Sequence, residues 1–146
     1  MPRLPALICT LCTAPIAALA PPPSVIIVGG TGRIGTAVAI HLLQRRPELQ
    51  ITLAGRSAER GAAATAEVAA EAADCGFLEL NYRDAAAMRN ACDGVDAVVH
   101  VAGPFVGKNK LEPLKAAIAS ETPVYVDVSD PLEYIDEAKQ LDARKT

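Results

Sequence analysis

The chain has 146 residues, a length typical of a single domain, and its formal net charge is −3. Such a charge gives no reason to expect nucleic acid as a partner, because nucleic-acid-binding proteins usually have a basic face. Hydrophobic residues make up 51% of the chain, but it has no tryptophan and only two phenylalanines. Its core must therefore consist mainly of small aliphatic side chains.

The first part of the chain differs from the rest. Residues 1–23 are almost entirely apolar, end in three prolines, and carry no acidic residue. Pro5 and Pro15 disfavour a membrane-spanning helix. Ala18-Leu19-Ala20 resembles a secretory cleavage site, whereas the lack of acidic residues suits an organelle transit peptide. We expect 1–23 to be a targeting leader, with a disordered extension or a membrane anchor as the alternatives.

A glycine-rich turn follows the first apolar run, residues 25–28. Gly30, Gly32 and Gly35 fit the spacing G-x-G-x-x-G, and apolar residues then recur at helical spacing. This pattern predicts a strand, a phosphate-binding turn and a helix whose N-terminus faces a dinucleotide. The candidate binding residues here are Gly30, Thr31, Gly32, Arg33, Ile34 and Gly35.

Strands and helices alternate through the remainder of the chain. We predict strands at 25–28, 50–54, 77–80, 96–102 and 124–128, and helices at 33–46, 58–73, 84–92, 112–120 and 131–142. Right-handed crossovers between such elements give an α/β fold of the Rossmann type. We expect one domain over 24–146, a parallel sheet of five strands in the order 3-2-1-4-5, and helices on both faces.

The end of the second strand bears on the choice of cofactor. NAD-binding proteins usually place an acidic residue about 20 residues after the glycines, to bind the ribose 2′-hydroxyl. This chain has Arg56 and Ser57 in that region. A guanidinium can form two charge-assisted hydrogen bonds to a 2′-phosphate, so the sequence favours NADP.

The third and fourth strands end in two further candidates. Asn81 could contact the adenine, although it could equally form a turn with Asp84 as a helix cap. Ala102 and Gly103 are small enough for the backbone to approach the cofactor closely.

Two other patterns are interpreted as non-functional. Cys9 and Cys12 have C-x-x-C spacing but lie in the apolar leader, so we expect no metal site there. His100 is a lone histidine inside the fourth strand, and we predict a structural role for it.

Four segments together resemble a known family. They are Gly29-Gly30-Thr31-Gly32-Arg33-Ile34-Gly35, Ala54-Gly55-Arg56, Val98-Val99-His100-Val101-Ala102-Gly103-Pro104-Phe105 and Val124-Tyr125-Val126-Asp127. In this order and spacing they are similar to the N-terminal NADP-binding domain of saccharopine dehydrogenase-like oxidoreductases, especially plastid-type members of plants and algae. The resemblance covers about residues 24–142. It implies NADP(H) as cofactor, a second domain that binds substrate, and a plastid transit sequence.

Short-chain dehydrogenases are the rival class, since they share the glycine pattern. They need a tyrosine followed four residues later by a lysine, and none of the three tyrosines here has one. Asp127, Ser129 and Asp130 fall at the end of the fifth strand, but without a substrate domain we assign no catalytic residue.

These observations lead to one main hypothesis. We expect the NADP(H)-binding domain of a saccharopine dehydrogenase-like oxidoreductase, truncated before its catalytic half. The alternative is a stand-alone nucleotide-binding module that senses the cofactor or docks on a partner. We further expect a plastid or other organelle as the location, or else the cytoplasm, no membrane association once the leader is removed, and possible homo-oligomers.

Overall fold

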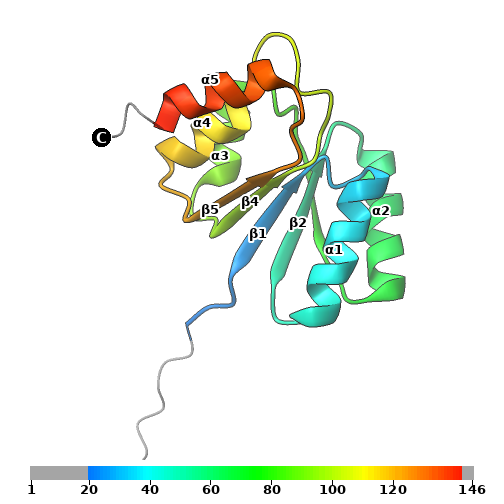
Figure 1. The fold of residues 1–146 in the computed structure, drawn as a ribbon. Coiled ribbons are helices and arrows are strands. Elements are labelled where there is room, and N and C mark those ends of the chain that lie inside the picture. The colour runs from blue at the N-terminus through cyan, green and yellow to red at the C-terminus, as the bar shows by residue number, and fades with distance from the viewer. Residues whose placement is uncertain (1–19, 143–146) are drawn as a thin grey trace, which may run out of the picture.

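The computed structural model describes residues 20–142, which form one parallel sheet with helices on both faces (Figure 1). The strands follow the order β3-β2-β1-β4-β5, so the predicted topology is confirmed. The elements in chain order are β1 (Ser24–Val28), α1 (Arg33–Arg45), β2 (Gln50–Gly55), α2 (Ala58–Glu71), β3 (Gly76–Glu79), α3 (Ala85–Cys92), β4 (Ala97–His100), α4 (Glu112–Ala119), β5 (Val124–Asp127) and α5 (Leu132–Asp142).

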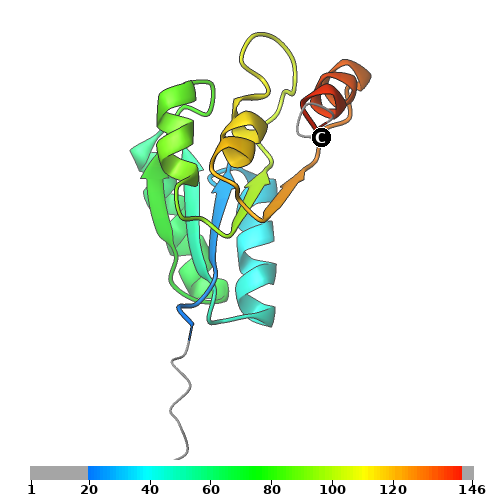
Figure 2. The same ribbon diagram turned by 90° about the vertical axis from the view of Figure 1, so that its left-hand side faces the viewer.

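Two helices cover one face of the sheet and three cover the other. Figures 1 and 2 show α1 and α2 on one side and α3, α4 and α5 on the opposite side. This division follows from the strand order, because right-handed crossovers that run in opposite directions from β1 place their helices on opposite faces. The chain therefore reverses direction between β1 and β4, where ligands bind in folds of this type.

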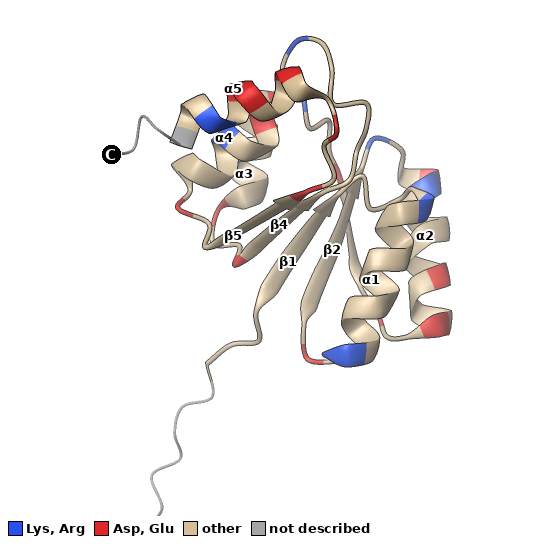
Figure 3. Cartoon of the chain, viewed as in Figure 1, with Lys and Arg blue, Asp and Glu red and all other residues tan. Residues whose placement is uncertain are grey.

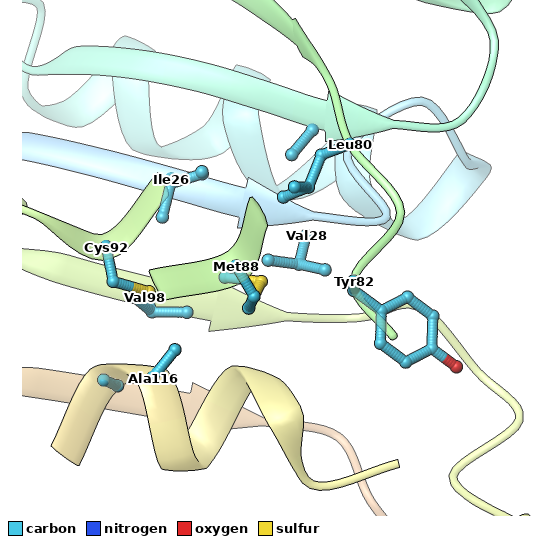
Figure 4. Packing of buried hydrophobic residues seen from close by; sticks show 10 residues of the cluster. Ile26, Val28, Leu80, Tyr82, Met88, Cys92, Val98 and Ala116 are labelled. Atoms are coloured by element: carbon cyan, nitrogen blue, oxygen red, sulfur yellow. The ribbon is translucent and has the colours of Figure 1, made fainter. Parts of the chain in front are cut away.

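The central strand β1 contributes to both cores. Ile27 packs on the side of α1 and α2, with Leu43 and Val68. Ile26 and Val28 pack on the other side, with Met88 and Cys92 of α3 among their neighbours (Figure 4). Side chains alternate along a strand, so a run of buried β-branched residues fills both faces at once.

The loop between β4 and α4 is held by a smaller cluster. Phe105 and Leu111 pack against Tyr134 of α5. Lys110 is only 5% exposed, and its Nζ lies 2.8 Å from Glu133 Oε1 and 3.0 Å from Glu137 Oε1. These contacts fasten the loop to α5 by apolar packing and by ion pairs.

The strand β5 lies at an edge of the sheet and is open on one face. The helices α1 and α2 lie over the β1, β2 and β3 side of the sheet (Figure 1). Consequently Val124, Val126 and Val128 are 48%, 50% and 51% exposed. Three β-branched apolar side chains thus meet solvent beside an unpaired strand edge.

The predicted boundaries need two corrections of note. The fourth strand ends at His100 rather than at 102. Val101 N–H still donates a hydrogen bond to Val28 O of β1 at 2.9 Å. Gly103 N–H instead donates to Val101 O at 3.2 Å, within its own segment, so the chain turns away from β1 there. The third strand covers Gly76–Glu79 instead of 77–80.

Two helices have side-chain caps at their N-termini. Ser57 Oγ accepts a hydrogen bond from Arg60 N–H at 3.3 Å and so caps α2. Asp84 caps α3 through Ala86 N–H and Ala87 N–H.

The predicted leader lies mostly outside the described residues. Of 1–23, only positions 20–23 are described, and all four are exposed. Cys9 and Cys12 also lie outside this part of the chain. Within residues 20–142, no helix has the length and apolar character needed to cross a membrane.

Candidate functional site

The turn after β1 is built from backbone contacts that require glycine. Gly29 has φ +85°, a left-handed conformation, and its N–H donates to Ala54 O at 2.9 Å. A Cβ on Gly35 would lie 2.5 Å from Gly29 O, and one on Gly30 would lie 2.8 Å from Ile27 O. The glycines thus allow α1 to pack directly against the turn and β1.

The N-terminus of α1 has free backbone donors. Its N-cap is Gly32, which provides no side-chain cap, and the first helical hydrogen bond is Thr36 N–H to Gly32 O at 2.9 Å. The N–H groups of 33–35 therefore have no acceptor within the helix. Together with the partial positive charge of a helix N-terminus, they form a site that suits a phosphate group.

A cleft of about 480 Å³ lies at the carboxyl ends of the strands, beside this turn. Its walls come from the turn after β1, the end of β2 with the start of α2, and the segments after β3 and β4. The lining residues are Val28, Gly29, Thr31, Gly32, Ala54, Gly55, Arg56, Ser57, Arg60, Leu80, Tyr82, Val101, Ala102 and Gly103.

Six of the predicted residues line this cleft. They are Thr31, Gly32, Arg56, Ser57, Ala102 and Gly103. Gly30 and Gly35 lie behind it, where they shape the turn. The side chains of Arg33 and Ile34 do not line it, and Ile34 is 55% exposed on the outer side of α1. These two positions can serve a phosphate only through their backbone N–H groups.

Asn81 adopts the alternative role. It is exposed, it does not line the cleft, and its Oδ1 accepts a hydrogen bond from Arg83 N–H at 3.2 Å. Leu80 and Tyr82 line the cleft in its place. The alternation of side chains along an extended chain could have predicted Leu80 and Tyr82 as cleft residues. It continues past β3 and directs 80 and 82 to one face and 81 to the other.

Two arginines mark the β2 end of the cleft. Arg56 and Arg60 both line it, and both are exposed. Among residues 20–142, neither guanidinium forms an ion pair or a side-chain hydrogen bond. Figure 3 shows basic residues at the start of α2, beside the end of β2. Two guanidinium groups without an internal partner, at the N-terminus of a helix, form a site that suits an anion.

His100, for which we predicted a structural role, is buried at the end of β4. It is 0% exposed, and its ring lies between those of Tyr82 and Phe105, with centroids at 5.1 Å and 4.7 Å. Burial lowers the pKa of His100 to about 4, so the imidazole is neutral near pH 7. Its role in a hydrogen-bond chain was not predicted.

The described residues contain no group of side chains suited to a metal ion. Cys75 is half-buried and Cys92 is buried, and burial raises the pKa of the Cys92 thiol to about 11. Neither thiol has the acidity of a reactive cysteine.

Comparisons with known structures support the fold. Pen from Bacillus thuringiensis shares 23% identity at a TM-score of 0.61, over 71% of this chain and 37% of that one. Saccharopine dehydrogenase (L-Glu forming) from Saccharomyces cerevisiae shares 19% sequence identity at a TM-score of 0.60, and the match covers 79% of this chain and 23% of that one. An NADPH-dependent quinone oxidoreductase from Escherichia coli shares 22% sequence identity at a TM-score of 0.56, and the match covers 82% of this chain and 42% of that one. The chain thus spans less than half the length of each of these proteins.

A search of curated proteins gave no match. A comparison with family descriptions gave one that covers almost the whole described domain, residues 25–144. The matched region includes the glycine turn, the backbone N–H groups at the start of α1 and the two arginines of the cleft. The chain belongs to the family of the saccharopine dehydrogenase NADP binding domain, and its cofactor is NADP.

Proposed function

We propose that this domain is the cofactor-binding part of an NADP(H)-dependent oxidoreductase and that its substrate is bound by a separate domain. The observation that carries the proposal is a pair of arginines beside the glycine turn, Arg56 and Arg60, whose guanidinium groups have no ion pair or side-chain hydrogen bond among residues 20–142. An NAD site would place a carboxylate there, and a cationic pair suits a 2′-phosphate instead.

Three parts of the cofactor would have matching groups in the cleft. The N–H groups at the start of α1 would bind the pyrophosphate. Arg56, Ser57 and Arg60 would bind the 2′-phosphate. The backbone at Ala102 and Gly103 leaves room for the nicotinamide end, because neither residue has a large side chain.

The bound cofactor supplies the hydride, and the residues of this chain bind and orient it. A second domain is supported by length, since the chain spans 23% of the yeast saccharopine dehydrogenase. Reaction requires a substrate held against the cofactor, and in this proposal a separate domain holds it there.

Calorimetric titration of the protein with NADPH and NADH tests this function. We expect NADPH to bind at least about tenfold more tightly, the difference that one charge-assisted hydrogen bond provides. Arg56→Ala should reduce this preference. Arg89→Ala is its matched control and should leave the preference unchanged, because Arg89 is an exposed arginine on α3, outside the cleft. Failure of NADPH to bind would refute the proposal.

We also propose that residues 1–23 direct the protein to a plastid or another organelle. The support is compositional: an apolar leader free of acidic residues precedes the domain. Fusing 1–23 to a fluorescent protein in a plant or algal cell tests this. Organelle fluorescence is expected, and diffuse cytoplasmic fluorescence would contradict it.

A further inference from the structure

A chain of polar side chains lies at the carboxyl ends of β4 and β5. His100 Nδ1 lies 3.2 Å from Tyr125 Oη, which lies 3.1 Å from Tyr134 Oη. Tyr134 in turn donates to Asp127 Oδ2 at 3.1 Å. Ser129 donates its hydroxyl at 2.6 Å and its N–H at 3.2 Å to Asp127 Oδ1. We call His100, Tyr125, Tyr134 and Asp127 the polar chain.

The polar chain is shielded from water at its inner end. His100 is fully buried and Tyr134 is 1% exposed, whereas Asp127 is half-buried. Burial raises the pKa of Tyr134 to about 12 and that of Tyr125 further. Both hydroxyls therefore remain protonated near neutral pH. Around the imidazole, the other titratable groups are Tyr82 and Arg83, which follow β3.

Counting hydrogens shows which tautomer His100 must have. Three contacts join the four groups, and each contact needs one hydrogen. The two tyrosine hydroxyls supply two. An ionised Asp127 can only accept, so the third hydrogen must be on His100 Nδ1. Nε2 is then a bare lone pair, and it has no partner among the described residues.

The same contacts are also satisfied in the reverse direction. A protonated Asp127 donates to Tyr134, Tyr134 donates to Tyr125, and Tyr125 donates to His100 Nδ1. His100 then carries its hydrogen on Nε2. Both arrangements leave the imidazole neutral, and they differ by one proton. The polar chain therefore has two states in which all three of its internal hydrogen bonds are made, and they are linked by uptake of a single proton. In both states Nε2 has no partner among the described residues.

The location of the polar chain connects it to the cleft. Val101, Ala102 and Gly103 line the cleft and directly follow His100. Tyr82 also lines it, and its ring packs against the imidazole. In the sheet, Asp127 pairs in register with His100. His100 and Asp127 thus lie at the edge where β4 and β5 end, beside Ala102 and Gly103, the small residues assigned to the nicotinamide. Tyr82 contacts His100 from the segment after β3.

We propose that the polar chain stores one proton at the nicotinamide end of the cleft and that its protonation follows the oxidation state of the bound cofactor. This rests on the proposed function. The nicotinamide ring is cationic in NADP⁺ and neutral in NADPH. A cationic ring favours an ionised Asp127, and loss of that charge on reduction favours uptake of a proton by the polar chain.

The proton transfer balances for oxidation of an alcohol or amine. The substrate would give its hydride to the cofactor and release one proton. The polar chain would take up one proton at His100 Nε2, which is buried behind the residues that line the cleft. The Nδ1 hydrogen passes to Tyr125, the hydrogen of Tyr125 passes to Tyr134, and that of Tyr134 passes to Asp127 Oδ2. In the reducing direction each hydrogen moves back and the proton returns to the substrate.

Nitrogen NMR on the cofactor-free protein tests the polar chain itself. The sequence has only two histidines, and exposed His41 supplies a reference signal. At about pH 8 we expect wild-type His100 to be the Nδ1–H tautomer. Asp127→Asn should convert it to Nε2–H, because Ser129 N–H fixes the amide oxygen at the Oδ1 position and directs the NH₂ group to Tyr134.

Two variants serve as controls. Ser129→Ala removes the hydroxyl donor to Asp127 Oδ1 and keeps the N–H donor, so His100 should remain Nδ1–H. Tyr125→Phe breaks the polar chain, so adding Asp127→Asn to it should leave the tautomer unchanged. An Nε2–H tautomer in the wild type at about pH 8, or no change in Asp127→Asn, would overturn the proposal.

Calorimetry in two buffers of different ionisation enthalpy tests the coupling to the cofactor. We expect NADPH binding to take up more protons than NADP⁺ binding as the pH is lowered from about 8 to about 5. The 2′-phosphate cancels from this difference, because both cofactors carry it. Asp127→Asn should abolish the difference while both cofactors still bind. Equal proton uptake in the wild type would refute the coupling, whereas failure of either cofactor to bind would refute the proposed function instead.

Discussion

Replacing Arg56 by alanine tests the cofactor site most directly. Arg56 lines the cleft without an internal partner, so its loss removes a contact to the ligand and disturbs no contact within the fold. A charge-assisted hydrogen bond contributes about 1.5–3 kcal/mol, which corresponds to roughly 10- to 150-fold in affinity. Arg56 is exposed, and Arg60 shares the site. We therefore expect NADPH binding to weaken by about 10- to 30-fold.

The same substitution should leave NADH binding almost unchanged, because NADH lacks the 2′-phosphate. Calorimetric titration of wild type and Arg56→Ala with both cofactors measures this difference. Arg56→Ala combined with Arg60→Ala should weaken NADPH further, by about 100-fold or more relative to wild type. Equal weakening for NADH and NADPH, or a wild type without preference, would show that Arg56 is a surface residue without a role in cofactor choice.

Four further predictions follow from the sequence and structure. The chain as given should bind NADPH yet transfer no hydride to a panel of carbonyl, imine and enoyl acceptors; measurable turnover would contradict the need for a second domain. Gly35→Ala should lower the free energy of unfolding by about 1–3 kcal/mol in urea titrations, because its Cβ would lie 2.5 Å from Gly29 O, whereas Gly76→Ala meets its nearest neighbour at 3.5 Å and should be milder. The pKa of His100 falls from 6.5 to about 4 on folding, because burial disfavours the charged imidazole. The free energy of unfolding should therefore be unaffected by this group above about pH 6.5 and decrease by roughly 3 kcal/mol as the pH falls toward 4. Urea titrations of His100→Gln should show a correspondingly weaker pH dependence. Limited proteolysis should remove 1–23 and leave a resistant fragment that begins near Ser24, whereas a protected leader would contradict this.

The sequence predicted the strand order and six of the cleft residues because both depend on local patterns. Alternation of elements determines the topology, and the glycine spacing locates the turn. The fourth strand was predicted too long because Val101 and Ala102 continue its apolar run, and only the bond from Gly103 N–H shows where the chain turns. Side-chain direction was the other source of error, since Asn81 occupies the outward position of an alternating segment.

The polar chain could not be predicted in the same way. Its four members come from β4, β5 and α5. Pairing of β4 with β5 brings His100 close to Tyr125 and Asp127, and α5 adds Tyr134. His100 therefore appeared as an isolated residue in the sequence. Its partners have no distinctive spacing from it, so the contact required the tertiary structure.

The open face of β5 has a consequence for the behaviour of the domain in solution. Val124, Val126 and Val128 form an alternating β-branched surface next to a strand edge that no other strand within residues 20–142 pairs with. Such an edge is a template on which another strand can add, and no lysine or proline within Val124–Val128 blocks it. We therefore expect that the domain, prepared alone at high concentration, can aggregate by sheet extension from the β5 edge.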